Sequence, residues 1–499
     1  MLTRRFFLAA LGSAALPVGQ GMAAGLTQSL RPVARGTTAE AAPAQKQAPS
    51  VAKLIAETRF SGDLAFAVCD AQTGEVLEQQ EVAGHLPPAS VAKSVTALYA
   101  LHHLGPAYRF RTRVLATAPV VGGVLDGDLV LVGGADPTLD TDGLAALARE
   151  VKASGLREVK GQFLVWGDAV LPHTQIDTEQ SPEAGYNPAI CGLNLNYNRV
   201  HFEWRKSGAK YDITMDARSE KYRPDVHMAT MKIVSRDVPV FTYANSAASD
   251  DWTVAQGALG NSGARWLPVR KPALYAGEVF AGFMRANGIA LKAPVITRTE
   301  PTGAVLGQHR SEALSDVLRG MLKYSTNLTA EIMGLAASER RLGAKVSMRV
   351  SAAEMSFWAA DQLGLEGALF VDHSGLGGES RVPAAGLAKA LSGLTREGLL
   401  PGLLKDIPIK KIDGAPDKAH PVKVVAKTGT LNFVSGLAGY ATTSKGRQLS
   451  FAIFSGDLDR RDALGPDERD RPPGGRTWNT RAKQLQQALI LRWDTLYDA

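Results

Sequence analysis

The sequence predicts an α+β fold: an antiparallel sheet flanked by helices, with a large β-rich insertion between its first and last parts. Three observations lead to it. Apolar, β-branched runs within 422–454 predict adjacent strands, and a strand pair is predicted within 64–81. From 116 to 299 the chain changes to many short apolar runs separated by Gly and Pro. We therefore expect one catalytic domain made of 50–115 and 300–499, with 116–299 inserted into it.

The N-terminus has the three parts of an export signal. The pair Arg4-Arg5 precedes an apolar run, Ala9–Leu16, and small residues near Met22–Ala24 fit a cleavage site. We predict an export signal over 1–24 and a flexible leader over 25–49. The paired arginines also resemble a twin-arginine signal, so the twin-arginine and Sec routes both stay open. The apolar run is shorter than the ~20 residues of a spanning helix.

The first catalytic segment begins with local elements that have clear boundaries. In order, these are a helix at Val51–Thr58, strands at Leu64–Asp70 and Val76–Glu81 and, after Pro87-Pro88, an apolar helix at Val91–Leu101. Ser90 is expected in the first turn of that last helix.

The insertion is expected to hold helices at Leu144–Ser154 and Leu274–Asn287 among its short strands. Within it, Val200–Ile213 alternates apolar and polar residues on both sides of a Ser-Gly turn, which predicts a hairpin. We expect a further domain nested over about 185–265.

The last segment returns to longer elements. Helices are predicted at Leu314–Tyr324 and Leu328–Ala337, and a final helix runs from Trp478 to about Trp493. The polar stretch 458–476 predicts a loop.

Three short motifs carry the chemistry, and they occur in the order Ser90-Val91-Ala92-Lys93, Ser325-Thr326-Asn327 and Lys427-Thr428-Gly429. A serine hydroxyl is a poor nucleophile unless a base lies beside it. Lys93 follows Ser90 by three residues and so shares its helix face. A lysine with a pKa of ~10.4 is a base at neutral pH only when desolvated or near a second cation, a role open to Lys427. The set predicts a serine acyl-transfer site without a histidine base.

Similar strings elsewhere are assigned to local structure. Ser207–Lys210 repeats the first motif and Lys206–Gly208 the third, but both lie in the predicted hairpin turn. Tyr243-Ala244-Asn245 matches a middle motif of some serine β-lactamases, yet it follows an extended run and predicts a strand end.

The ordered set resembles the penicillin-recognising serine enzymes. The long gap between Ser90 and Ser325 narrows the resemblance to class C low-molecular-mass penicillin-binding proteins, the D-alanyl-D-alanine carboxypeptidase/endopeptidase family, which carries inserted domains there. Further matching strings are Gly127–Val130, Gly134–Leu139, Asp372–Leu376, Lys427–Leu431 and Gly436–Tyr440. The resemblance covers about 50 to 455 and implies a transpeptidase-like, β-lactamase-like serine domain.

The motif chemistry and the resemblance together suggest a role for each catalytic residue. Ser90 is the expected nucleophile and Lys93 its base. Ser325 and Lys427 are expected to pass the proton to the leaving group, and Asn327 to hold the lysine and a substrate amide.

The expected substrate-binding residues lie around this group. Lys427 and Thr428 are expected to hold a terminal carboxylate, and the backbone N–H groups of Ser90 and Thr430 to hold the oxyanion. The remaining expected binding residues are Gly429, Leu376 and Tyr186.

Two departures from the family pattern concern side-chain recognition. Gly378 stands where the family has an arginine, and Ser181 stands where it has an aspartate, with Glu183 nearby. In the relatives, those two charges read the zwitterionic end of a diamino-acid side chain.

The leading hypothesis is a D-alanyl-D-alanine carboxypeptidase or endopeptidase that acts on peptidoglycan stem peptides through an acyl-enzyme on Ser90 and is acylated by β-lactams. The two activities cleave the same bond type, so the balance between them stays open. A serine β-lactamase and a catalytically silent cell-wall binding protein are the alternatives.

Composition agrees with an exported protein among anionic polymers. The formal net charge is +7 and the pI about 9.2, which suits anionic cell-wall polymers or peripheral contact with phospholipid. The sequence contains no basic stripe with interleaved aromatic residues, so nothing in it indicates nucleic-acid binding. We expect a periplasmic enzyme without cofactor, metal or transmembrane span. Cys69 and Cys191 are expected to be buried free thiols.

Overall fold

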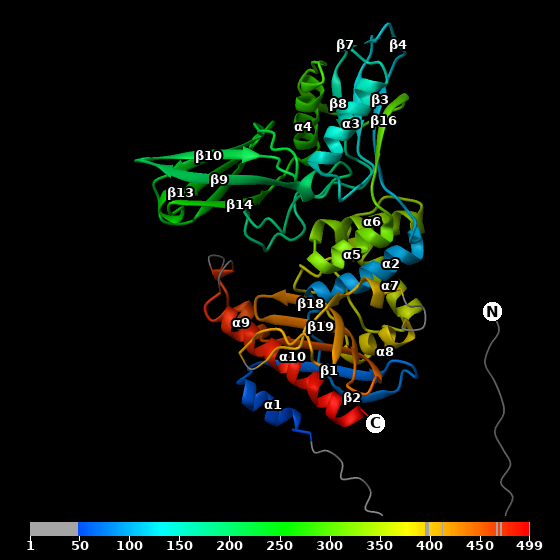
Figure 1. Cartoon of the computed structure of the whole chain (residues 1–499), viewed down its shortest axis with the longest axis vertical. Helices are drawn as coiled ribbons and strands as arrows, with labels where there is room; N and C mark the ends of the chain where they lie inside the picture. The colour runs from blue at the N-terminus through cyan, green and yellow to red at the C-terminus, as the bar shows by residue number, and fades with distance from the viewer. Residues whose placement is uncertain (1–47, 395–398, 412, 466–467, 470–471, 499) are drawn as a thin grey trace, which may run out of the picture. The chain divides into compact units, whose positions relative to one another are not determined.

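The computed structural model describes residues 48–394, 399–411, 413–465, 468–469 and 472–498. The predicted export signal and the leader up to residue 47 lie outside the described residues. The described chain has the predicted mixture of sheets and helices (Figure 1).

The central sheet of the catalytic domain is antiparallel throughout, with the order β17-β18-β19-β20-β1-β2. Its strands are β1 (Asp63–Asp70), β2 (Val76–Gln80), β17 (Lys405–Asp406), β18 (Lys423–Leu431), β19 (Val434–Thr442) and β20 (Gln448–Gly456). Strands from the first part of the described chain (β1, β2) and strands from its last part (β17 to β20) therefore share one sheet.

Each face of this sheet has its own core. Along β1, Ala65, Ala67 and Cys69 belong to one cluster of buried residues, and the residues between them to another, because successive side chains of a strand point to opposite faces. The helices α1 (Val51–Thr58) and α10 (Gly475–Tyr497) cover one face, and α8 (Ala384–Leu394) packs on the other (Figure 1).

The face with α8 also carries a group of helices that includes those with residues of the first two motifs. These are η1 (Ala89–Val91), α2 (Ala92–Leu104), α5 (Leu314–Tyr324), α6 (Asn327–Leu342) and α7 (Met348–Leu363), with the short η4 (Pro401–Leu403) beside α5. Ser90 lies in the 3₁₀ turn before α2 and not inside a helix starting at Val91. The first residue of that turn, Ala89, has a left-handed backbone (φ 46°).

The insertion starts and ends in two paired strands. Its main sheet has the order β15-β8-β6-β3-β16, beside a small sheet β4-β5-β7 and the helices α3 (Thr141–Ala153) and α4 (Pro272–Ala286). The strands are β3 (Arg111–Ala116), β4 (Val120–Val121), β5 (Val124–Leu125), β6 (Leu129–Val132), β7 (Glu158–Val159), β8 (Phe163–Trp166), β15 (Pro294–Ile296) and β16 (Ala304–Arg310).

The strand pairing locates the two ends of the insertion. The first strand β3 and the last strand β16 are antiparallel neighbours (Figure 1). Just outside them, Phe110 and Ser311 bond to each other: the Ser311 N–H donates to the Phe110 carbonyl at 3.0 Å, and the Phe110 N–H to Ser311 Oγ at 2.9 Å. We therefore propose that the insertion runs from about 111 to about 310.

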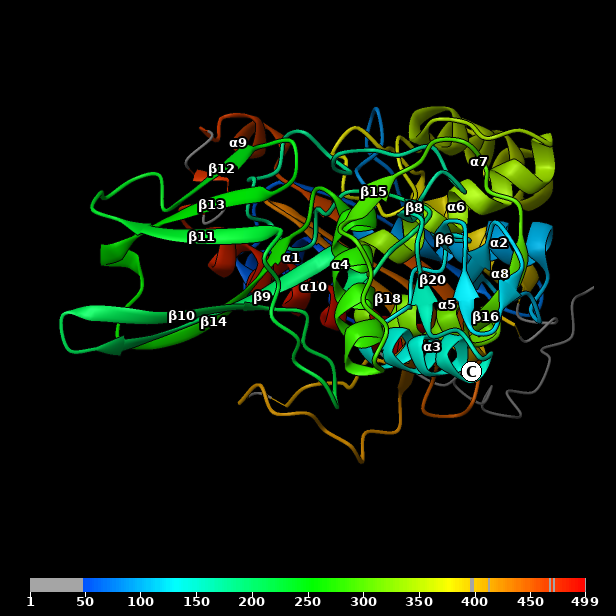
Figure 2. The same ribbon diagram turned by 90° about the horizontal axis from the view of Figure 1, so that it is seen from above.

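Two further three-stranded sheets lie within the insertion, next to each other in Figure 2. One has the order β10-β9-β14 and the other β11-β13-β12. Their strands are β9 (Arg199–Ser207), β10 (Lys210–Asp216), β11 (Ala229–Val234), β12 (Phe241–Asn245), β13 (Asp250–Ala255) and β14 (Ser262–Pro268), with η2 (Asn196–Asn198) and η3 (Gln256–Ala258). Ser207 pairs with Lys210 across a tight hairpin, so the second copies of the first and third motifs lie in the predicted turn. Tyr243-Ala244-Asn245 forms the end of β12, as predicted.

Other expectations concern smaller features. The stretch 458–476 is not all loop, because Asp457 caps a short helix, α9 (Leu458–Asp462). Cys69 and Cys191 are free and buried. In the part of the chain that the structure describes, no helix is long and apolar enough to cross a membrane. Among the same residues, no group of His, Cys, Asp and Glu side chains could hold a metal ion.

Candidate active site

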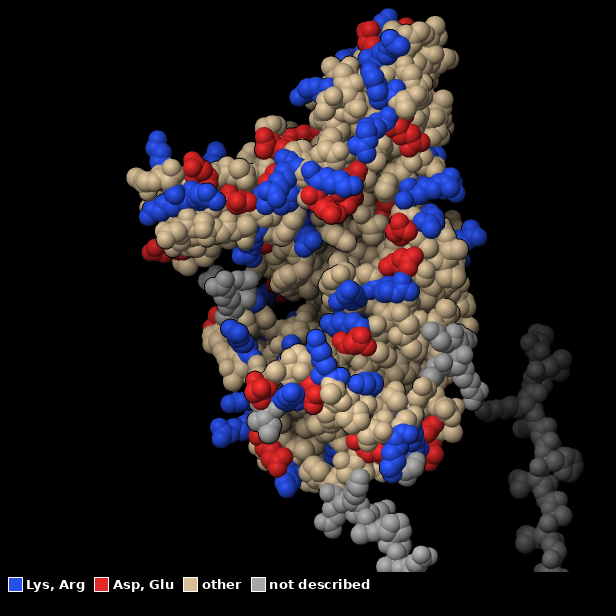
Figure 3. Space-filling view, in the orientation of Figure 1, with Lys and Arg blue, Asp and Glu red and all other residues tan. Residues whose placement is uncertain are grey.

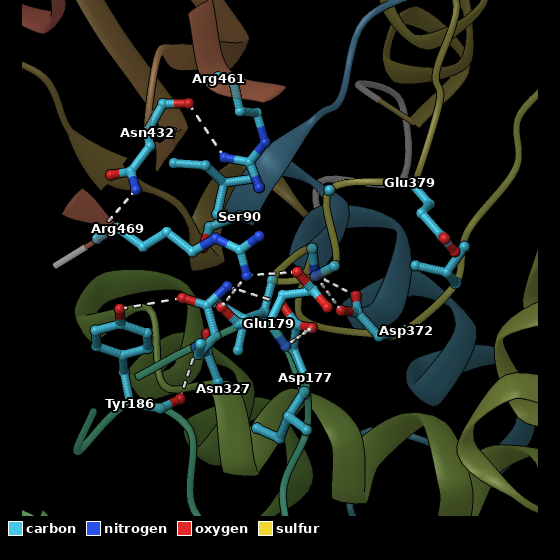
Figure 4. A pocket seen from close by; sticks show the side chains of 18 of the residues that line it. Ser90, Asp177, Glu179, Tyr186, Asn327, Asp372, Glu379, Asn432, Arg461 and Arg469 are labelled. Atoms are coloured by element: carbon cyan, nitrogen blue, oxygen red, sulfur yellow. Dashed lines mark hydrogen bonds and ion pairs between the residues drawn. The ribbon is translucent and has the colours of Figure 1, made fainter. Parts of the chain in front are cut away.

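Ser90 opens onto a pocket of about 1260 Å³ (Figure 4). The predicted site residues among those that line it are Ser90, Tyr186, Ser325, Asn327, Leu376 and Thr430. Lys93 and Lys427 are fully buried beside it. The three motifs, distant in sequence, therefore meet in one place.

Lys93 Nζ contacts groups from three separate parts of the site. It lies 2.9 Å from Ser90 Oγ, 2.7 Å from Asn327 Oδ1 and 2.6 Å from the Ser374 carbonyl. Burial lowers the pKa of Lys93 to about 8, although nearby carboxylates raise it in part. An amine with that pKa is roughly one-tenth neutral at pH 7, so it can accept a proton from the serine.

Two buried carboxylates support this lysine, and sequence reasoning missed both. Glu331 accepts the backbone N–H groups of His373 (3.1 Å) and Ser374 (2.9 Å). Asp372 accepts those of Gly375 and Gly377, each at 2.6 Å. The two carboxylates thus hold the 372–377 loop so that the Ser374 carbonyl contacts Lys93. Burial raises the pKa of Glu331 to about 8 and raises that of Asp372.

A signal for Glu331 exists in the sequence. It follows Asn327 by four residues in a predicted helix and so shares its face.

Ser325 and Lys427 form a second hydroxyl–amine pair. Lys427 Nζ donates to Ser325 Oγ at 2.9 Å and to the Thr428 carbonyl at 2.6 Å. Ser325 ends α5 in the left-handed region (φ 59°), a backbone conformation that is costly for a residue with a side chain and frequent at functional sites.

The expectation that Lys427 lowers the pKa of Lys93 as a second cation needs correction. The depression at Lys93 comes from burial. Burial, with Lys93 as a secondary cause, also holds the pKa of Lys427 well below its usual range.

The β18 residues after Lys427 approach the nucleophile closely. A Cβ at Gly429 would lie 2.6 Å from the Pro88 carbonyl oxygen and 3.0 Å from the Ser90 nitrogen. Only glycine therefore lets β18 run this near to Ser90. The next residue, Thr430, lines the pocket, whereas Thr428 and Gly429 are outside the lining.

The insertion contributes one wall of the pocket. Asp177, Glu179 and Tyr186 line it, and Glu179 pairs with Arg469 at 2.5 Å (Figure 4). The Asn327 amide donates to the Tyr186 carbonyl at 2.9 Å. Ser181, which stands in the place of the family aspartate, is not part of the lining, but Asp177 and Glu179 supply carboxylates from the same segment.

An arginine from another element occupies the space beside Gly378. A Cβ at Gly378 would lie 2.7 Å from Nη2 of Arg461, which is carried by α9. Arg461 lines the pocket and donates to the Asn432 carbonyl at 3.1 Å (Figure 4). The guanidinium missing at 378 is thus present at the same wall, from a position that the sequence pattern did not indicate.

The fold and the site define a class. A serine beside a buried lysine, on an antiparallel sheet covered by helices, is the arrangement of the penicillin-recognising serine acyl-transfer enzymes.

Comparison with known proteins identifies the family within that class. The model of the D-Ala-D-Ala carboxypeptidase 3 (S13) family matches residues 47–471, and the chain belongs to that family. The predicted family and the predicted activity, a serine-type D-Ala-D-Ala carboxypeptidase, are confirmed.

Individual relatives agree with this assignment. A D-alanyl-D-alanine carboxypeptidase of Actinomadura sp. (strain R39) is 30% identical over 440 residues, which cover 78% of this chain and 76% of the relative. The D-alanyl-D-alanine carboxypeptidase DacB of Haemophilus influenzae is 22% identical over 439 residues, 84% of this chain and 91% of the relative.

The solved structures confirm the predicted fold. The crystal structure of penicillin binding protein 4 (dacB) from Haemophilus influenzae has a TM-score of 0.69 at 19% identity, and the match covers 88% of this chain and 99% of that one. The same protein has also been solved in complex with a novel β-lactam.

Charge on the visible surface is mixed. Figure 3 shows Lys and Arg side chains intermixed with Asp and Glu over the whole face. The net charge of +7 is therefore not gathered into one basic patch on this face.

Proposed function

We propose that this enzyme cleaves peptidoglycan stem peptides at a D-Ala-D-Ala bond or at a crosslink, through an ester on Ser90. The observation that carries the proposal is the 2.9 Å contact between Ser90 Oγ and the amine of Lys93, which is fully buried. A hydroxyl becomes a nucleophile when a neutral base can take its proton.

The reaction has two stages, acylation of Ser90 and hydrolysis of the resulting ester. Ser90 Oγ attacks the carbonyl carbon and its proton passes to Lys93 Nζ. The C–N bond breaks, and the proton reaches the leaving amine through Ser325, which Lys427 contacts. Water then attacks the ester carbonyl: its oxygen becomes part of the new carboxyl group of the released peptide, and one of its protons restores the Ser90 hydroxyl. The backbone N–H groups of Ser90 and Thr430 hold the oxyanion.

Substrate recognition uses the groups around this core. Asn327 holds Lys93 and the substrate amide, and Lys427 with Thr428 holds the terminal carboxylate. Gly429 lets β18 lie close to Ser90, and Leu376 and Tyr186, which line the pocket, border the substrate. A β-lactam offers a strained amide in the same pose, so we propose that it acylates Ser90.

A labelled penicillin tests the nucleophile. Wild type should become covalently labelled and Ser90→Ala should not. The matched control is Ser207→Ala, because Ser207 opens the second Ser-x-x-Lys string, in a hairpin turn. Label that persists in Ser90→Ala, or fails to attach to wild type, refutes the assignment.

Digestion of whole peptidoglycan tests the substrate. Release of D-alanine indicates carboxypeptidase activity, and loss of crosslinked muropeptides indicates endopeptidase activity. Rapid turnover of a chromogenic cephalosporin, with neither product, would favour the β-lactamase alternative. We also propose that the export signal carries the enzyme to the periplasm, which cell fractionation of the full chain tests.

A further inference from the structure

One loop of the insertion reaches into the catalytic domain. Residues 173–190, here called the strap, leave the insertion core and return to it: His173 and Ile190 exchange backbone hydrogen bonds at 2.8 and 3.0 Å. Between these ends, Ile176 to Gln180 and Tyr186 line the catalytic pocket. The strap therefore belongs to the insertion in sequence and to the active site in space.

The guanidinium group of Arg270 binds the backbone of the strap. Its Nη1 donates to the carbonyls of Thr174 (3.0 Å) and Asn187 (2.7 Å), and its Nη2 to that of Pro182 (2.8 Å). One planar guanidinium thus joins three carbonyls spread along the loop. An ammonium group has no such fork, so lysine cannot reproduce this geometry.

Asn187 and Gly185 hold the strap from the other side. The fully buried Asn187 side chain accepts the N–H groups of Ile176 and Asp177, each at 2.9 Å, and donates to the Asp177 carbonyl at 2.7 Å. Gly185 lies so close to β14 that a Cβ there would be 2.6 Å from the Trp266 carbonyl oxygen. These contacts leave little freedom to the residue between them, Tyr186.

The Tyr186 carbonyl meets the middle catalytic motif. Asn327 Nδ2 donates to it at 2.9 Å, while Asn327 Oδ1 accepts from Lys93 at 2.7 Å. The two ends of an amide differ only in that one donates and the other accepts. A rotated amide would face the Tyr186 carbonyl with its oxygen and lose that contact, and its N–H groups would compete for the lone pair that Lys93 needs as a base. The position of the Tyr186 carbonyl therefore selects the orientation that Lys93 needs.

We infer that Arg270 is a positioning residue for acyl transfer: through the strap it holds the Tyr186 carbonyl that orients Asn327 toward Lys93. The insertion is then part of the catalytic machinery, although it carries none of the three motifs. This inference rests on the proposed roles of Lys93 and Asn327.

Two variants perturb the strap from opposite sides. Arg270→Lys removes the fork, and Gly185→Ala displaces the strap from β14. Each has a control in the same insertion: Arg205→Lys, on the exposed end of β9, and Gly257→Ala, where a Cβ meets nothing within 4 Å. If Arg270→Lys does not fold, Gly185→Ala still carries the test.

The readout is the rate of acylation by a labelled penicillin, alone and combined with Asn327→Ala. Each strap variant should acylate about fivefold or more slowly, the loss expected from one hydrogen bond of ordinary net strength. The controls should match wild type. In the Asn327→Ala background the strap variants should cause no further loss, because the group they position is gone.

Some results overturn the inference. An equal loss in both backgrounds would show that the strap acts only by general stability, and an unchanged rate in folded strap variants would show that it does not act. Failure of the inference is distinct from failure of the proposed function, because labelling of Ser90→Ala tests the latter without any change in the strap.

Discussion

Replacing Gly334 by alanine should destabilise the protein, against the usual effect of this change in a helix. Gly334 lies inside α6, where alanine would ordinarily add about 1 kcal/mol of stability. Here a Cβ would lie 2.1 Å from ring atoms of His373. The imidazole is fully buried, and its Nε2 lies 2.7 Å from Ser351 Oγ. The backbone carbonyl of the same residue accepts from Thr96 at 2.6 Å.

The magnitude follows from these constraints. Because the ring has no free space, the new methyl must displace it or bend α6, and such overpacking costs about 1–3 kcal/mol. Ser374, whose carbonyl contacts Lys93, follows His373 directly, so a displaced ring also disturbs the base. We expect a net loss of stability and slower acylation by penicillin.

Urea unfolding and acylation rates measure the two effects. The matched control is Gly320→Ala in α5, where a Cβ meets nothing within 4 Å and stability should rise by up to about 1 kcal/mol. Adding His373→Ala to Gly334→Ala should recover part of the loss, as expected for residues in contact. If Gly334→Ala is as stable as Gly320→Ala, the steric argument is wrong.

Three further predictions use other measurements. Because the base must be neutral, acylation should rise with pH to a plateau, with a midpoint near the Lys93 pKa of about 8; a flat profile from pH 6 to 9 would contradict this role. Arg461→Met should weaken hydrolysis of stem peptides with an anionic side chain by about tenfold or more, as for a charged hydrogen bond, and leave penicillin acylation near wild type; equal losses would argue against a recognition role beside Gly378. Burial raises the pKa values of Cys69 and Cys191 to about 11, so a thiol reagent should label neither native thiol and both after denaturation.

Much of the fold could be predicted because its signals are local. β18 contains the β-branched pair Val424-Val425, and β19 and β20 are largely apolar, as expected for buried strands. Pairing of the last strands with β1 is not local, and the sequence analysis did not predict it. The short helix α9 was missed because five residues give too little periodicity to detect.

In the site, too, some residues could be predicted from the sequence and others could not. That the motif serines, lysines and asparagine lie together could be predicted because the proposed chemistry requires these side-chain types. Glu331 acts on backbone N–H groups of a distant loop, and the Tyr186 contact uses a carbonyl that every residue possesses. Arg461 reaches its place only because α9 folds against the 372–381 loop. The four-residue spacing from Asn327 indicates only the helix face of Glu331, and neither backbone contacts nor such proximity can be predicted from a single sequence.

The two hydrogen bonds between Phe110 and Ser311 bear on how such enzymes can evolve. The chain leaves the catalytic domain and returns to it at neighbouring residues. A short hairpin could therefore replace the whole insertion without changing the strand order of the central sheet. An insertion of this kind can be gained, lost or exchanged as a unit. The insertion and the catalytic domain can then diversify at separate rates everywhere except along the strap, whose residues line the catalytic pocket.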